Sequence, residues 1–110
     1  MMKFLFILLS LTIFSLTSDA AIYKGQRVFV KKCLKCHKDG QNFVAKYKKK
    51  TWKKWMKDKG KPLAELHLKN KKARKSWNYF SSKKYTKKSK HLKQFLIEYA
   101  KDSGNIPACN

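Results

Sequence analysis

The stretch KKCLKCHKDG, residues 31–40, places two cysteines three positions apart and a histidine directly after the second one. Thiols and an imidazole in this pattern serve three kinds of chemistry: a redox-active dithiol, half of a zinc site, or the covalent attachment of a haem. Which of these the chain supports depends on the elements that position Cys33, Cys36 and His37.

The first two kinds of chemistry find little support elsewhere in the chain. A redox-active C-x-x-C pair belongs near a strand–helix unit, and no strand is predicted before Cys33. A structural zinc site needs four ligands, commonly from a second pair at similar spacing. The remaining candidate ligands are scattered singly along the sequence: His67, His91 and Cys109.

Haem attachment uses every residue of the motif. The Cys33 and Cys36 thiols can each form a thioether with one vinyl group, and His37 is then close enough to bind the iron as the proximal ligand. A chain too small to enclose a cofactor by packing alone gains stability from a covalent link. The motif therefore predicts one covalently attached haem c per chain.

The N-terminus has the form of an export signal. Lys3 precedes the apolar run FLFILLSLTIFSL, and small residues follow up to Ala20. The run is shorter than the roughly 20 apolar residues that span a membrane, so we predict a signal peptide over residues 1–20. The mature chain, residues 21–110, is then a single domain located in the periplasm.

The composition is dominated by lysine. The chain has 28 basic and 6 acidic residues and a net charge of +22, which favours anionic partners. Export argues against nucleic acid as the partner, as does the presence of only two arginines, Arg27 and Arg74. An acidic periplasmic redox protein, a membrane oxidoreductase or an anionic membrane surface is expected instead.

The hydrophobic pattern predicts an all-α fold with no strand. Apolar residues recur at helical spacing in successive segments, and glycine, proline and serine residues separate these segments. The first predicted helix covers 23–35, the second is capped by Thr51 and stopped by Gly60, and the third starts near Pro62. A basic stretch over 69–90 follows and breaks at Ser81-Ser82. The last predicted helix is opened by His91.

The stretch GQRVFVKKCLKCHKDG resembles the N-terminal helix of the class I c-type cytochromes, with a glycine and then an aromatic residue before the haem motif. The ending HLKQFLIEYAKDSGN is similar to the C-terminal helix of that family. The resemblance covers about half of the mature chain and is closest to the small monohaem cytochromes of bacteria. It implies that the two helices cross beside the haem and that Gly25 permits their close approach. It also implies that three aromatic residues pack around this contact between the helices: Phe29, Phe95 and Tyr99.

The sixth iron ligand is not given by this resemblance, because the family's methionine loop before the last helix is missing. Met56 lies on the stripe of Trp52 and Trp55, where a core role competes with ligation. His67 follows two leucines in PLAELHLKN, and His91 opens the predicted last helix. We predict His67, with Met56, His91, a lysine or an open position as alternatives.

The expected function is one-electron transfer rather than catalysis. A collar of lysines around the motif would guide an acidic partner to the haem: Lys31, Lys32, Lys35 and Lys38. A haem enzyme or gas sensor with an open or displaceable sixth ligand is the alternative, and a basic protein without haem is a third interpretation. Cys109 is either an inert tail thiol or the site of a disulfide-linked dimer.

Overall fold

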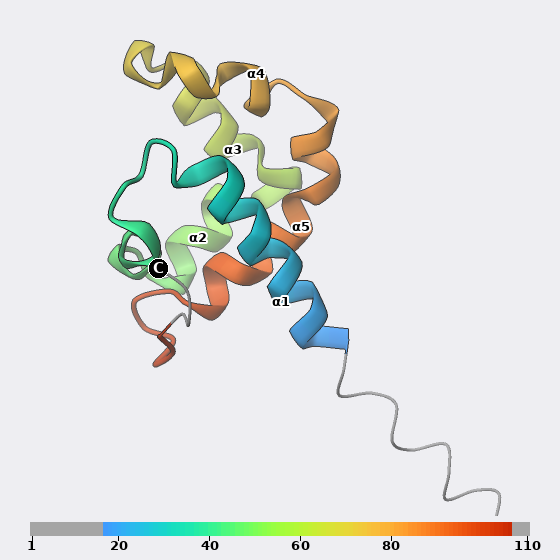
Figure 1. Cartoon of the computed structure of the whole chain (residues 1–110), viewed down its shortest axis with the longest axis vertical. Coiled ribbons are helices and arrows are strands. Elements are labelled where there is room, and N and C mark those ends of the chain that lie inside the picture. The colour runs from blue at the N-terminus through green and yellow to red at the C-terminus, as the bar shows by residue number, and fades with distance from the viewer. Residues whose placement is uncertain (1–16, 107–110) are drawn as a thin grey trace, which may run out of the picture.

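The computed structural model describes residues 17–106, and these form an all-helical fold with no strand among them (Figure 1). The prediction of an all-α fold is therefore confirmed for these residues. Most of the predicted signal peptide, residues 1–16, and Cys109 lie outside the described residues. The elements, in chain order, are α1 (Thr17–Val28), η1 (Phe29–Cys33), η2 (Gly40–Lys46), α2 (Lys49–Trp55), α3 (Lys57–Leu68), η3 (Lys71–Ser76), α4 (Trp77–Phe80) and α5 (Lys83–Glu98).

The first and last helices make the most extensive contact in the fold, and they cross in Figure 1. Gly25 lies at the crossing: a Cβ atom added there would be 2.0 Å from the carbonyl oxygen of His91 and 2.8 Å from Cβ of Phe95. Phe29 and Phe95 pack beside it with ring centroids 5.4 Å apart, and Phe95 also contacts Tyr99 at 5.2 Å. The predicted crossing of these helices at Gly25 is thus confirmed.

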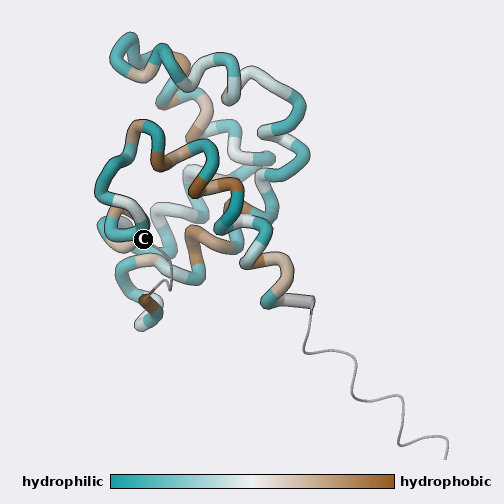
Figure 2. Tube along the Cα trace, in the orientation of Figure 1, coloured by the Kyte–Doolittle hydropathy of each residue, from teal (hydrophilic) through white to brown (hydrophobic). Residues whose placement is uncertain are grey.

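The core is small and rich in aromatic side chains. Trp52, Tyr85, Phe29 and Phe95 are almost completely buried, so large rings provide most of the apolar area removed from water. Hydrophilic positions dominate the chain trace, and apolar ones gather where α1 passes into η1 and toward the end of α5 (Figure 2). This distribution fits a small domain that has few aliphatic residues to bury.

The first helix ends earlier than the predicted helix over 23–35. Regular α-helix stops at Val28, and η1 continues it as one π-helical turn in which Leu34 N–H donates to the Phe29 carbonyl over 3.2 Å. Such turns are rare and occur frequently at functional sites.

Ala20, after which cleavage of the predicted signal peptide is expected, lies within α1. No helix of the described residues is long and apolar enough to cross a membrane.

The predicted cap at Thr51 is wrong. Helix α2 begins three residues earlier than this cap implies: Lys48 is the N-cap, and its side chain makes no capping hydrogen bond. The carboxylate of Asp102 accepts a hydrogen bond from Lys49 N–H over 2.8 Å, which satisfies one of the free donors at the helix start. This bond holds the pKa of Asp102 below its usual range. A distant residue therefore provides the cap, which local spacing could not show.

Helices α2 and α3 are joined by a left-handed turn. Asp58, Lys59 and Gly60 all have positive φ angles of 49°, 57° and 76°, a conformation that costs energy for the first two. The Tyr85 hydroxyl donates to the Gly60 carbonyl over 2.6 Å and fixes this turn from α5. Regular helix resumes after Gly60, so Pro62 lies in its first turn as predicted, where a missing N–H is tolerated.

The last helix starts at Lys83 rather than at His91. Ser82 is its N-cap, and the Ser82 hydroxyl accepts a hydrogen bond from Tyr85 N–H over 3.3 Å. Lysine has a good helix propensity, so the basic stretch after the Ser81-Ser82 break continues as helix up to Glu98. His91 is therefore in the middle of α5, and the prediction that it opens a helix is wrong.

Candidate functional site

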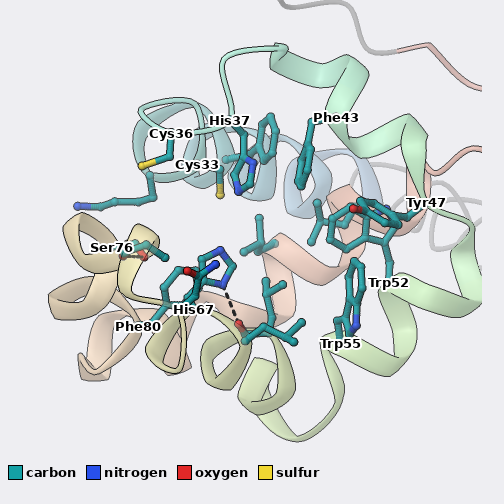
Figure 3. Close-up of a pocket in the computed structure, with 18 of the residues that line it drawn as sticks. Cys33, Cys36, His37, Phe43, Tyr47, Trp52, Trp55, His67, Ser76 and Phe80 are labelled. Atoms are coloured by element: carbon teal, nitrogen blue, oxygen red, sulfur yellow. Dashed lines mark hydrogen bonds between the residues drawn. The ribbon is translucent and has the colours of Figure 1, made fainter.

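The Cys-x-x-Cys-His motif lies at the end of η1, where the chain turns back on itself. The His37 N–H donates to the Cys33 carbonyl over 2.9 Å, and Gly40 N–H donates to the His37 carbonyl over 3.2 Å. Gly40 has a positive φ of 64°, which a glycine adopts without strain. These bonds place the Cys33, Cys36 and His37 side chains along one wall of a cavity (Figure 3).

His67 lies on the opposite wall, on the last turn of α3. Its Nδ1 is 2.8 Å from the Leu63 carbonyl oxygen. Because a carbonyl only accepts, Nδ1 carries a proton in this hydrogen bond, and Nε2 is the nitrogen left for a metal. The Trp77 indole N–H donates to the His67 carbonyl over 2.8 Å and so anchors the helix end that carries this histidine.

The space between these walls is a cavity of about 510 Å³, within the usual size range of cofactor sites. Figure 3 shows His37 and His67 pointing into it from opposite sides, with aromatic rings at one end. Its lining is mainly apolar and aromatic: Phe29, Phe43, Tyr47, Trp52, Trp55, Leu63, Leu66, Ala73, Phe80, Leu92 and Leu96, with the polar residues Lys32, Asn70, Lys72 and Ser76.

The two imidazoles are separated by a distance that suits a shared metal. Their ring centroids are 6.2 Å apart, and the ring planes are at 88° to one another. A metal–imidazole bond is about 2 Å long, so two rings on opposite sides of one metal ion have centroids about 6 Å apart. The residues present therefore fit a flat metal cofactor that takes one histidine on each face.

The other candidates for the distal position lie elsewhere. Met56 is 2% exposed, and its sulfur accepts a contact from the Tyr85 hydroxyl over 3.9 Å, which fits a core residue. His91 belongs to the α1–α5 contact, next to Gly25. Neither residue lines the cavity.

The surroundings of the His37 imidazole disfavour its charged form. Burial lowers the pKa of His37, and the nearby His67 and Lys46 lower it further. A neutral ring is the form that binds a metal. The surroundings of His37 therefore favour the form that could bind a metal.

The thiol chemistry of the site argues against a redox dithiol. Burial, with a contribution from Cys36, raises the pKa of Cys33 to about 12. A thiol that stays protonated is a poor nucleophile, whereas a catalytic C-x-x-C pair needs a lowered pKa. Cys33 therefore lacks the lowered pKa that a redox-active thiol needs.

A bare metal ion is also a poor fit. In residues 17–106, no group of three or more histidine, cysteine, aspartate or glutamate side chains is placed to hold one ion. Cys33, Cys36, His37 and His67 line the same cavity without converging on one point. A cofactor large enough to span the cavity would contact all four.

Sequence analysis missed the rings that support the histidines. Phe43 stacks on His37 with a centroid distance of 3.9 Å, and Phe80 stacks on His67 at 4.1 Å. Phe43 lies in η2, within a segment that has no clear periodicity, so no local signal marked it. Phe80 ends α4, and nothing in the sequence links it to His67.

Comparisons with models of known protein families, with curated proteins and with solved structures found no match to this chain.

Proposed function

We propose that this protein is a small monohaem c-type cytochrome that carries single electrons in the periplasm. One observation carries the proposal: Cys33, Cys36 and His37 face His67 across one apolar cavity, at a ring separation that accommodates a metal ion. When bound, haem c would supply an iron centre that accepts and releases one electron. The resemblance of the first and last segments to class I c-type cytochromes supports the same function.

Each residue of the site has a separate role in this proposal. Cys33 and Cys36 would hold the cofactor covalently, His37 would bind its iron on one face, and His67 would bind the other face. Two protein ligands leave no position for a substrate, which favours electron transfer over catalysis. Paired histidines are expected to leave the reduction potential below that of a histidine–methionine pair.

The surface supports an anionic partner. In the described part of the chain a single ion pair, between Lys46 and Asp39 at 2.7 Å, neutralises little of the positive charge. The four collar lysines are all exposed, and Lys32 also lines the cavity. An acidic periplasmic redox protein or a membrane oxidoreductase would be drawn to this side by charge and held in a weak, transient complex.

Optical spectroscopy of the exported protein tests the proposal. We expect sharp absorption bands of a low-spin haem in the reduced state. After denaturation and solvent extraction the haem absorbance should stay with the polypeptide, because the cofactor is covalently held. Carbon monoxide should bind the reduced protein slowly or not at all, since His67 fills the distal position. Immediate carbon monoxide binding would favour the haem enzyme or gas sensor, and a colourless exported protein would favour the basic protein without haem.

Charge steering gives a second expectation. Oxidation of the reduced protein by hexacyanoferrate(III), an anion, should slow by about tenfold or more as ionic strength rises, because salt screens the attraction. Replacing the collar lysines with glutamate should lower the rate at low salt. The same charge change on exposed lysines of α5 that do not line the cavity should lower it less: Lys83, Lys84, Lys87 and Lys88. Equal effects of the two variants would remove the steering role of the collar.

A further inference from the structure

The two phenylalanines next to the histidines provide an inference that rests on the proposed function and goes beyond it. We propose that Phe43 and Phe80 are positioning residues that hold the imidazoles of His37 and His67 at right angles to one another. The bound iron would then lie between crossed ligand planes. The packing around the cavity, rather than the cofactor, would set this angle.

Each histidine has its own stacking partner. The His37 ring is nearly parallel to Phe43, at 19° and 3.9 Å, and the His67 ring is nearly parallel to Phe80, at 26° and 4.1 Å. The two histidine planes differ by 88°. The right angle between the imidazoles therefore follows from the orientations of two separate phenylalanine rings.

The phenylalanine rings are themselves held by other aromatic side chains. Phe43 makes edge contacts with Tyr47 at 5.7 Å and Trp52 at 6.1 Å. These contacts lie on the side of the cavity formed by η2 and α2. Rotation of Phe43 would separate several rings at once, so its orientation is fixed by packing.

The second phenylalanine has a separate set of neighbours. Phe80 packs against Tyr79 at 5.3 Å and against Tyr85 at 4.9 Å with an interplanar angle of 74°. His67 has a further restraint, the hydrogen bond from Nδ1 to the Leu63 carbonyl. The aromatic neighbours of Phe43 and those of Phe80 are different residues. Neither imidazole can therefore turn to align with the other without disrupting the aromatic contacts on its own side of the cavity.

Crossed planes have a distinct magnetic signature. Each imidazole raises the energy of the iron d orbital that overlaps its π system, so parallel rings separate two orbitals that perpendicular rings leave nearly equal in energy. Near-equal orbitals make the ferric low-spin centre strongly anisotropic. Its electron paramagnetic resonance spectrum then shows one dominant feature at low field instead of three well-resolved g-values.

The test is this spectrum of the ferric holoprotein and of three variants. The wild-type protein should show the low-field signal. Phe80→Leu should convert a large part of it to the three-line signal while the iron stays low-spin, because His67 loses the ring that stacks on it and keeps only the hydrogen bond to Leu63. Phe80→Tyr, which keeps the ring, should retain the wild-type signal. Phe95→Leu makes the same change at a buried phenylalanine that does not line the cavity, and should leave the signal unchanged.

The possible failures are distinguishable. A low-spin wild-type spectrum with three resolved g-values, or a Phe80→Leu spectrum identical to wild type, overturns the positioning role and leaves the proposed function intact. Conversion by Phe95→Leu as well would also overturn it, because general loosening of the core would then explain the effect. A protein without haem overturns both proposals, and the wild-type measurement decides this even if a variant fails to fold.

Discussion

Replacing His67 by alanine should convert the ferric protein from low-spin to high-spin and allow carbon monoxide to bind the reduced form at once. The reason is geometric: His67 is the one histidine that faces His37 across the cavity, at 6.2 Å between ring centroids. Alanine leaves that face of the cofactor without a protein ligand. Optical and magnetic spectra of the two oxidation states would measure the change.

Two matched variants control for indirect effects. Met56→Leu and His91→Ala remove the other candidate ligands, which do not line the cavity, and both should leave the low-spin spectrum as it is. An unchanged spectrum in His67→Ala would contradict the assignment. If Met56→Leu or His91→Ala instead gave a high-spin spectrum, the replaced residue would be the iron ligand.

Gly25→Ala should destabilise the protein strongly, although the same change in an open helix is favourable by about 1 kcal/mol. At Gly25 the change in stability has the opposite sign, because the new Cβ would lie 2.0 Å from the His91 carbonyl oxygen. This oxygen is a backbone atom and cannot move independently of α5. Overpacking of this kind costs about 1–3 kcal/mol and occasionally more. Denaturant unfolding of the holoprotein should show a loss at the upper end of that range.

Lys24→Ala is the matched control, since it places an alanine at the neighbouring exposed position of α1. Its free energy of unfolding should change by no more than about 0.5 kcal/mol. A Gly25→Ala variant that is as stable as wild type or more stable would show that α1 and α5 do not approach as closely as described. Gly25 would then not be required for the contact between α1 and α5.

Family resemblance and local spacing were enough to predict part of the fold and of the site. The resemblance to class I c-type cytochromes placed Gly25 and Phe29 at the contact between the first and last helices, and the spacing of Cys33, Cys36 and His37 marked the candidate attachment motif. The motif could be read because its meaning depends on neighbours within one or two helical turns. His67 was predicted from its central position in the chain and from the missing methionine loop, and the structure shows it facing the same cavity as His37.

Other features depend on contacts between distant segments, which spacing does not encode. Asp102 caps α2, and Tyr85 fixes the left-handed turn at Gly60 across 25 positions of the sequence. Phe80 meets His67 across 13 positions of the sequence because α4 packs against α3. In each case the residue type is common and its partner is set by the tertiary fold, so the role becomes visible only once the helices are packed.

The most direct test of the account is the intact mass of the mature polypeptide, produced in a host equipped for cytochrome maturation. The account predicts the mass of residues 21–110 plus one haem, and loss of the added mass when Cys33 and Cys36 are both replaced by serine. A wild-type polypeptide that matures in that host with only its bare peptide mass would contradict the central claim.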